Sequence, residues 1–407
     1  MSSDNRAEES SQIAGWYLTE LIRCSLHGEV PGKKPEGCTW EQLWQLARWN
    51  HVESMAAPAI RRYPGELPHE PGNIWKQTLD ETVYRRVRFD MEREQILTAL
   101  ADRGIACLPL KGILVAGYYP EPGMRWMCDN DILYGYVEPD GAGGWKLRGT
   151  DAGEQEHWVQ KTQEELVSVM TDLGYEVECL EGNHDSFHKK PFFNFEMHRR
   201  LVDAACDLAG YFANPWQRAV RNGDHEFGYH FSDEDEYLFL ISHAWKHFHG
   251  SGCGIRTLAD EYVVLKQKGE MDWDYIHREL ALLGVADFEE SLRKTAVNVF
   301  SWAGRPDEQD WDMVWYMLGC GTYGTFSNRI RLRMEEHGGS RRSYLAERFW
   351  IDEDRMREFY PFFYRHRALR VVLPVYRILK GICIHPGKLL QEWQEVNKYK
   401  VKDKEQE

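Results

Sequence analysis

One stretch, residues 104–136, limits the folds open to this chain more than any other part of it. Its first apolar residues predict a strand that ends at the pair Lys111-Gly112. Residues 113–119 predict one or two helical turns, because two prolines follow directly. The motif Asp129-Asn130-Asp131 then opens a second predicted strand. We therefore expect a small sheet that is built around these two strands.

The two aspartates of this motif indicate a metal site. Side chains at i and i+2 of a strand point to the same face, so Asp129 and Asp131 are expected to project together. Oxygen ligands with no neighbouring Cys or His pair suit Mg²⁺ or Mn²⁺. A lone Asp-x-Asp is common by chance and is more often an acidic turn at a strand end. The order strand, Lys-Gly, short helix, Arg125 and Asp-x-Asp shifts the interpretation towards the metal site.

A second acidic strand is predicted over residues 192–197. Apolar residues alternate there with polar ones, so Glu196 lies on the polar face. A carboxylate on a neighbouring strand would supply a third metal ligand and a base for an attacking hydroxyl group. The alternative is a half-exposed edge strand, and the pattern alone does not decide between the two interpretations.

Residues between the two acidic strands predict further elements of the core. A helix is expected over 162–173, followed by a strand over 175–180 with Val177 and Cys179 on its buried face. Residues 181–191 are interpreted as a loop.

Both flanks of this core predict helices. Helical spacing recurs over residues 11–62, a longer helix over 74–103 ends at Gly104, and the pattern is helical again from Asp233 onward. The predicted fold class is α/β (α+β), with a small mixed sheet embedded in mainly helical N- and C-terminal segments. The expected divisions are an N-terminal helical segment (1–90), an α/β core (91–205), a helical domain (206–350) and a basic, aromatic tail (351–407).

Two features of the helical part suggest further contacts. His243 and His247 lie four residues apart on a predicted helix, a spacing that can hold a metal ion. Packing or substrate contact is the favoured role, because no third ligand is evident. The Gly-rich turn 250–257, with Arg256, could hold phosphate at a helix N-terminus. It fits a plain turn between helices equally well.

Residues 359–391 contain no Asp or Glu, although the chain as a whole has a net charge of −15. Basic residues alternate there with aromatic and aliphatic ones. This pattern predicts either an amphipathic helix on an anionic surface or a helix that packs on the acidic body. Packing on the body is the favoured interpretation, because the polar face carries few charges for membrane attachment.

Composition excludes several classes of protein. The net charge of −15 argues against a general nucleic-acid binder, because phosphate affinity comes mostly from Lys and Arg. The nine Cys residues form no CxxC pair, so neither a disulfide framework nor a zinc knuckle is indicated. No secretory signal and no run of ~20 apolar residues is found. A reducing cytoplasm is the expected compartment, and the oligomeric state is open.

The ordered set of motifs resembles the uncharacterised nucleotidyltransferase family, within the polymerase-beta-like nucleotidyltransferase superfamily. Motifs that carry the resemblance are Leu110-Lys111-Gly112, Arg125, the run 127–134, Leu173-Gly174-Tyr175, Gly182-Asn183-His184-Asp185, Glu196-Met197-His198, His243 with Lys246-His247, and Gly254-Ile255-Arg256. The resemblance implies the nucleotidyltransferase core fold. The wider superfamily has Gly-Ser or Gly-Gly where this chain has Lys111-Gly112, so Lys111 would replace the phosphate-binding serine.

The activity that the resemblance implies is Mg²⁺- or Mn²⁺-dependent transfer of a nucleotidyl group from an NTP to a small-molecule or protein acceptor, with release of pyrophosphate. The expected catalytic and metal-binding residues are Asp129, Asp131 and Glu196. The expected nucleotide-binding residues are Lys111, Gly112 and Arg125. Lys111 could instead pair with a nearby carboxylate such as Asp129. The alternative function is a catalytically silent nucleotide-binding or antitoxin-like regulatory protein.

Overall fold

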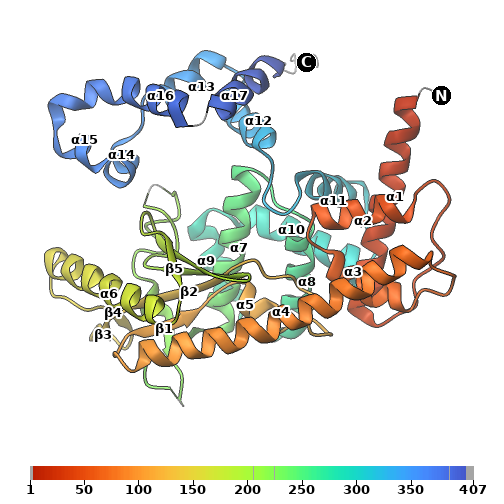
Figure 1. Ribbon diagram of the computed structural model, residues 1–407, viewed down its shortest axis with the longest axis horizontal. Helices are drawn as coiled ribbons and strands as arrows, with labels where there is room; N and C mark the ends of the chain where they lie inside the picture. Colours follow the sequence, from red (N-terminus) through yellow and green to blue (C-terminus); the bar gives the residue numbers. More distant parts are fainter. Residues whose placement is uncertain (1–2, 205, 224, 385, 400–407) are drawn as a thin grey trace.

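The computed structural model describes residues 3–204, 206–223, 225–384 and 386–399. It is 59% helical and 10% strand, which confirms the predicted α/β class with a small mixed sheet among many helices (Figure 1). The main sheet has the strand order β1-β2-β7-β6-β5. Its strands are β1 (Ala106–Pro109), β2 (Asn130–Gly135), β7 (Phe193–His198), β6 (His184–Lys189) and β5 (Glu176–Cys179).

The parallel pairing of β2 with β7 places the two acidic strands side by side. Asp131 and Glu196 are direct partners in this register. All six residues of β2 are buried, because apolar cores cover both of its faces. Along β7, buried Phe193 and Phe195 alternate with half-buried Asn194 and Glu196, as the sequence pattern predicts.

Two long helices, α4 (His69–Ala101) and α6 (Ala152–Asp172), cover one face of the sheet and share an apolar core with it. The predicted end of the long helix is confirmed. Gly104 has a φ of +73°, and Ile105 N–H donates to the Leu100 carbonyl at 3.0 Å. A glycine in this left-handed conformation ends the helix and turns the chain into β1.

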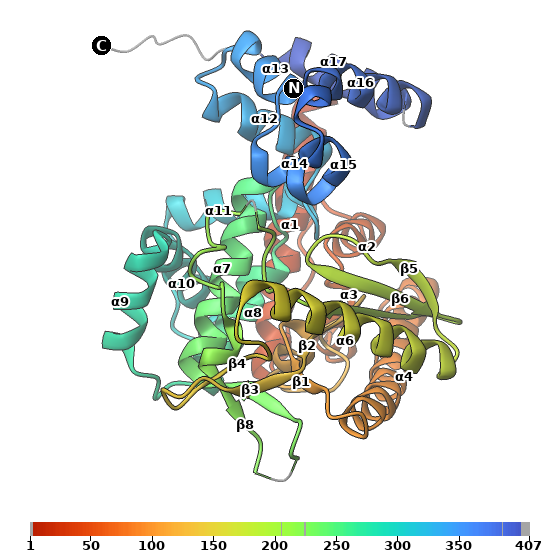
Figure 2. The ribbon, with the colours of Figure 1, turned by 90° about the vertical axis from the view of Figure 1, so that its left-hand side faces the viewer.

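The opposite face of β1 and β2 belongs to a second, larger apolar core that helices build. These helices are α1 (Ser3–His27), α2 (Trp40–Trp49), α3 (Glu53–Arg61), α7 (Asp233–Gly250), α8 (Arg256–Gln267), α9 (Trp273–Leu283), α10 (Ala286–Phe300) and α11 (Glu308–Cys320). Helices that precede the sheet in the chain and helices that follow it thus pack together on this face (Figure 2). Small elements complete this part: α5 (Gly112–Val115), η1 (Pro215–Arg218), and the hairpins β3 (Val137–Pro139) with β4 (Trp145–Leu147) and β8 (Ala219–Arg221) with β9 (Tyr229–Phe231).

Two local predictions are wrong. Residues 181–191, interpreted as a loop, contain strand β6, which pairs with β5 on one side and β7 on the other. The predicted buried face of β5 is exposed, and Val177 itself is 41% exposed. All four residues of β5 are exposed, so no other layer covers either of its faces, and an alternating pattern cannot report whether a face is covered.

The C-terminal helices form a lobe that lies to one side of the rest in both views (Figures 1 and 2). They are α12 (Phe326–Glu336), α13 (Arg341–Phe349), α14 (Glu353–Phe359), α15 (Pro361–Arg365), η2 (Arg367–Val372), α16 (Leu373–Ile384) and α17 (Pro386–Lys398). Many apolar side chains of 359–391 are exposed, so the segment does not bury them on the acidic body as we expected. Among the described residues, no helix is both long and apolar enough to cross a membrane.

Candidate functional site

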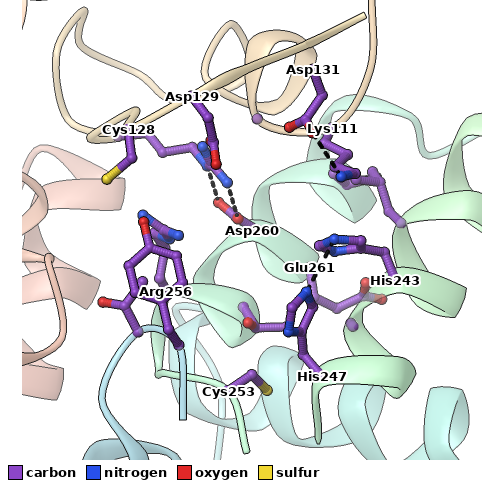
Figure 3. A pocket seen from close by; sticks show the side chains of 18 of the residues that line it. Lys111, Cys128, Asp129, Asp131, His243, His247, Cys253, Arg256, Asp260 and Glu261 are labelled. Atoms are coloured by element: carbon purple, nitrogen blue, oxygen red, sulfur yellow. Dashed lines mark hydrogen bonds and ion pairs between the residues drawn. The ribbon is translucent and has the colours of Figure 1, made fainter. Parts of the chain in front are cut away.

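A pocket of about 320 Å³ lies between the acidic strands and the helices α7 and α8. All the site residues that we predicted from the sequence line it: Lys111, Gly112, Arg125, Asp129, Asp131 and Glu196. The helical side contributes His243, His247, Cys253, Arg256, Asp260 and Glu261. Asp129 and Asp131 enter the pocket from the sheet side, and the two histidines enter it from α7 (Figure 3).

Asp131 is a buried carboxylate of the pocket, with a side chain only 7% exposed. Lys111 Nζ donates to its Oδ1 at 2.8 Å, and His198 Nε2 lies 2.7 Å from the same oxygen. Burial opposes ionisation, but the Lys111 ammonium and the hydrogen bond from His198 hold the pKa of Asp131 well below its usual range. Asp131 is therefore an anion, and it is the carboxylate partner of Lys111 in place of Asp129.

The backbone at Lys111 has an unusual conformation. Its φ is +52°, in the left-handed region that side chains with a Cβ rarely adopt. Such a residue typically costs on the order of 1 kcal/mol or more, so the surroundings must hold it in place. The buried ion pair with Asp131 is a contact that does so. The strained position directs the ammonium into the pocket.

The other two carboxylates have raised pKa values. Burial, together with the negative charge of Asp131, raises the pKa of Asp129 above its usual value. Burial and the charges of Asp131 and Asp129 raise the pKa of Glu196 to about 7. Three carboxylates in one pocket thus repel one another, and a cation between them would remove that repulsion.

Two imidazoles lie beside Glu196 and were not among the predicted ligands. The Nε2 atoms of His184 and His198 are each 3.8 Å from Glu196 Oε2, and the three ligand atoms lie within 4.8 Å of one another. Burial, followed by the charge of Lys111, lowers the pKa of both histidines, so both are neutral. His198 donates its Nε2 proton to Asp131. His184 Nδ1, by contrast, lies 3.1 Å from Asn183 Oδ1, which leaves its Nε2 free to act as a ligand. Sequence analysis missed His184 as a site residue, because residues 181–191 were interpreted as a loop and not as a strand.

Arg125 lies in the pocket wall and is bound to an acidic residue of α8. Its Nε and Nη2 donate to the two carboxylate oxygens of Asp260, each at 2.8 Å, and the Tyr119 hydroxyl donates to the same carboxylate at 2.8 Å. The remaining nitrogen, Nη1, faces Gly112, where an added Cβ would lie 2.6 Å from it. Arg125 therefore joins the sheet side to α8, and Gly112 gives its guanidinium room.

A second arginine in the pocket is not held in an ion pair. Arg256 begins α8 at the Gly-rich turn and forms no ion pair with any residue in the described ranges. Its Nη1 donates only a long hydrogen bond, 3.4 Å, to the Trp126 carbonyl. The guanidinium is thus available to an anion in the pocket.

The histidine pair on α7 is neutral. The Nε2 atoms of His243 and His247 are 3.2 Å apart. Burial lowers the pKa of His247 to about 4 and that of His243 well below its usual value. Within the described parts of the chain, the one group of three or more metal-ligating side chains is His184, Glu196 and His198, and the α7 pair lies outside it. Packing or substrate contact stays the prediction for this pair.

Glu261, in the same pocket, is a buried carboxyl group that carries a proton at neutral pH. The Tyr237 hydroxyl lies 2.7 Å from one oxygen of Glu261 and 2.6 Å from one oxygen of Glu289. A hydroxyl has a single proton for these two contacts, so one carboxyl must be protonated. Arg293 pairs with Glu289 at 2.7 Å, and burial raises the pKa of Glu261 to about 8.

Glu261→Gln is expected to remove a pH dependence of stability. The unfolded chain releases the Glu261 proton near pH 4.5 and the folded chain near pH 8, so the folded state of the wild type loses stability as pH rises between them. The loss is up to roughly 1.4 kcal/mol per pH unit. Denaturant titrations of both proteins from pH 5 to pH 9 measure it, and parallel curves would contradict the assignment.

Comparison with known families gives one match that covers most of this region. The model of a family described as uncharacterised nucleotidyltransferase matches residues 36–137 and 158–301, more than half of the chain. The matched ranges contain every site residue that we predicted, and they end before the C-terminal lobe. No curated protein and no solved structure matches. The chain belongs to the uncharacterised nucleotidyltransferase family.

Proposed function

We propose that this protein transfers a nucleotidyl group from an NTP to a hydroxyl group of a small-molecule or protein acceptor and releases pyrophosphate. Membership of a nucleotidyltransferase family supports nucleotidyl transfer in general. The proposal of this particular reaction rests on one observation: Asp129, Asp131 and Glu196 line the same pocket. Lys111 and Arg256 line the same pocket as cations.

The donor set fits a divalent cation. Asp129 and Glu196 have raised pKa values beside Asp131, and a cation would offset this crowding of negative charge. Asp129, Asp131 and Glu196 line the pocket but do not form a close ligand group, so Mg²⁺ or Mn²⁺ would have to draw their oxygens together. The imidazole of His184 beside Glu196 would favour Mn²⁺ over Mg²⁺, because Mg²⁺ prefers oxygen ligands alone. When bound, the ion would neutralise phosphate charge and lower the pKa of the acceptor hydroxyl group.

In the proposed transfer, the acceptor oxygen forms a bond to the α-phosphorus. The bond from that phosphorus to the oxygen bridging the β-phosphate breaks, and pyrophosphate leaves with the electron pair. Glu196 would take the acceptor proton: burial and the neighbouring carboxylates raise its pKa to about 7 in the metal-free pocket, and a bound cation would lower it. Asp131 cannot hold that proton, since its pKa is well below its usual range. Lys111 and Arg256 would stabilise charge on the phosphates.

Pyrophosphate release tests the proposal. We expect the wild type to release it from at least one of the four NTPs with Mn²⁺ or Mg²⁺, in the presence of a cell lysate as a source of acceptors. Asp129→Asn should weaken Mn²⁺ binding, measured by calorimetry, by about tenfold or more, because a charged ligand is lost. The amide has nearly the same shape, so the circular dichroism spectrum should be unchanged.

Two outcomes would contradict the proposal. Equal Mn²⁺ affinity in the wild type and Asp129→Asn would mean that Asp129 is not a metal ligand and that the site is assigned to the wrong residues. Nucleotide binding without pyrophosphate release, under every combination of NTP and metal, would favour the catalytically silent regulatory protein.

A further inference from the structure

The C-terminal lobe carries an exposed apolar stripe that neither the fold nor the pocket uses. Five aliphatic side chains along η2 and α16 are 46% to 72% exposed: Val371, Val375, Ile378, Leu379 and Ile382. Spacings of three and four residues place such side chains on one face of a helix. Single exposed apolar residues are ordinary, but a continuous apolar patch of this kind marks an interaction surface.

The segment that carries this stripe is basic. Residues 359–391 include six Lys or Arg and no Asp or Glu, in a chain of net charge −15. Four of the six basic side chains are exposed: Arg365, Arg367, Lys380 and Lys388. Exposed aromatic side chains, Phe362 and Tyr376, lie on the same segment. The surface therefore combines apolar, aromatic and cationic groups, as interfacial helices do.

The position of the lobe keeps this surface away from the acidic body. Both views show α13, α16 and α17 on the side of the lobe away from the sheet, whereas α14 and α15 extend towards the rest of the chain (Figures 1 and 2). Repulsion between charges is largely screened beyond about 8–10 Å at physiological salt. Salt therefore weakens the repulsion between the acidic body and an anionic partner of the lobe.

We propose that the C-terminal lobe docks on an anionic lipid surface, with the apolar stripe among the acyl chains and the basic side chains at the headgroups. A second copy of this chain fits less well, because two such faces would bring like charges together. A lipid layer also covers an apolar stripe of any shape, whereas a protein partner must match it. The matched family region ends at residue 301, so docking does not depend on the proposed transfer activity.

Co-sedimentation of the full chain with vesicles tests this proposal. The probes are phosphatidylcholine vesicles with and without phosphatidylserine. We expect binding to vesicles that contain phosphatidylserine and a decrease as salt rises, since each basic residue near the surface contributes about fivefold in affinity. The double variant Val375→Glu/Leu379→Glu should lose at least about tenfold of the binding. The matched control is Leu282→Glu on α9, which replaces a side chain that is 71% exposed outside the lobe and should bind like the wild type.

The same samples show whether a second copy of the chain, and not lipid, covers the apolar stripe. A folded wild type that binds neither type of vesicle would overturn the proposal, and so would equal binding to both. Sedimentation velocity gives the oligomeric state. If the wild type is a dimer that the double variant converts to a monomer, a second copy covers the stripe and the lipid assignment is wrong.

Discussion

Asp131→Asn is expected to lower the free energy of unfolding of the metal-free protein by roughly 3–5 kcal/mol, the usual effect of removing one partner of a buried ion pair. The ammonium of Lys111 lies 2.8 Å from Asp131, and both side chains are largely buried. An amide leaves that charge without an anionic partner, and it also removes the anion that His198 contacts. Denaturant unfolding in the presence of a chelator measures the change.

Asp129→Asn is the matched control for this prediction. Asp129 forms no ion pair within the described residues, and its pKa is raised because it is buried beside Asp131. Removing its charge relieves repulsion, so the metal-free variant should be at least as stable as the wild type. Both variants should lose pyrophosphate release. Equal stability of the two variants would show that the Lys111–Asp131 pair contributes nothing to the fold.

Glu196→Gln is expected to reduce the turnover number at least about a hundredfold, the lower end of the usual effect of a positioned proton acceptor. Glutamine keeps the shape of the side chain but cannot take a proton. In the wild type, turnover should rise with pH as Glu196 loses its own proton, and the variant should lack this rise. A bound cation lowers the pKa of Glu196, so the rise begins below the metal-free value of about 7.

Glu178→Gln is the control, because Glu178 is also a glutamate on a strand of the same sheet. It lies on β5, at the edge of the sheet and exposed to solvent. Its replacement should leave turnover unchanged. If Glu178→Gln abolished turnover and Glu196→Gln spared it, the assignment of the proton acceptor would be reversed.

Features that depend on neighbouring residues in the chain were predictable from the sequence. The pattern predicts helices from Asp233 onward, and α9 (Trp273–Leu283) shows the local cause: Asp272 accepts a hydrogen bond from Tyr275 N–H at its start, and Gly284 ends it with a φ of +70°. The alternation around Glu196 likewise reports a strand with one buried face, since side chains alternate with a period of two.

Features that depend on the position of a strand within the sheet were not predictable in the same way. The pattern of β5 indicates a buried face, yet all four of its residues are exposed, because no other layer covers either face. Strand β6 has a polar sequence, and its hydrogen bonds to β5 and β7 make it a strand. The exposure of β5 and the strand conformation of β6 both depend on which other segments, distant in the chain, pack against them.

The sequence by itself determined the carboxylates of the pocket, because Asp129, Asp131 and Glu196 follow from local strand patterns and from the resemblance to a family. Only the tertiary structure decided how these groups are paired. Lys111 binds Asp131, His184 lies beside Glu196, and Arg125 binds Asp260, which is 135 residues away in the chain. The physical reason is that ion pairing and burial depend on distance in space, which a one-dimensional pattern does not contain.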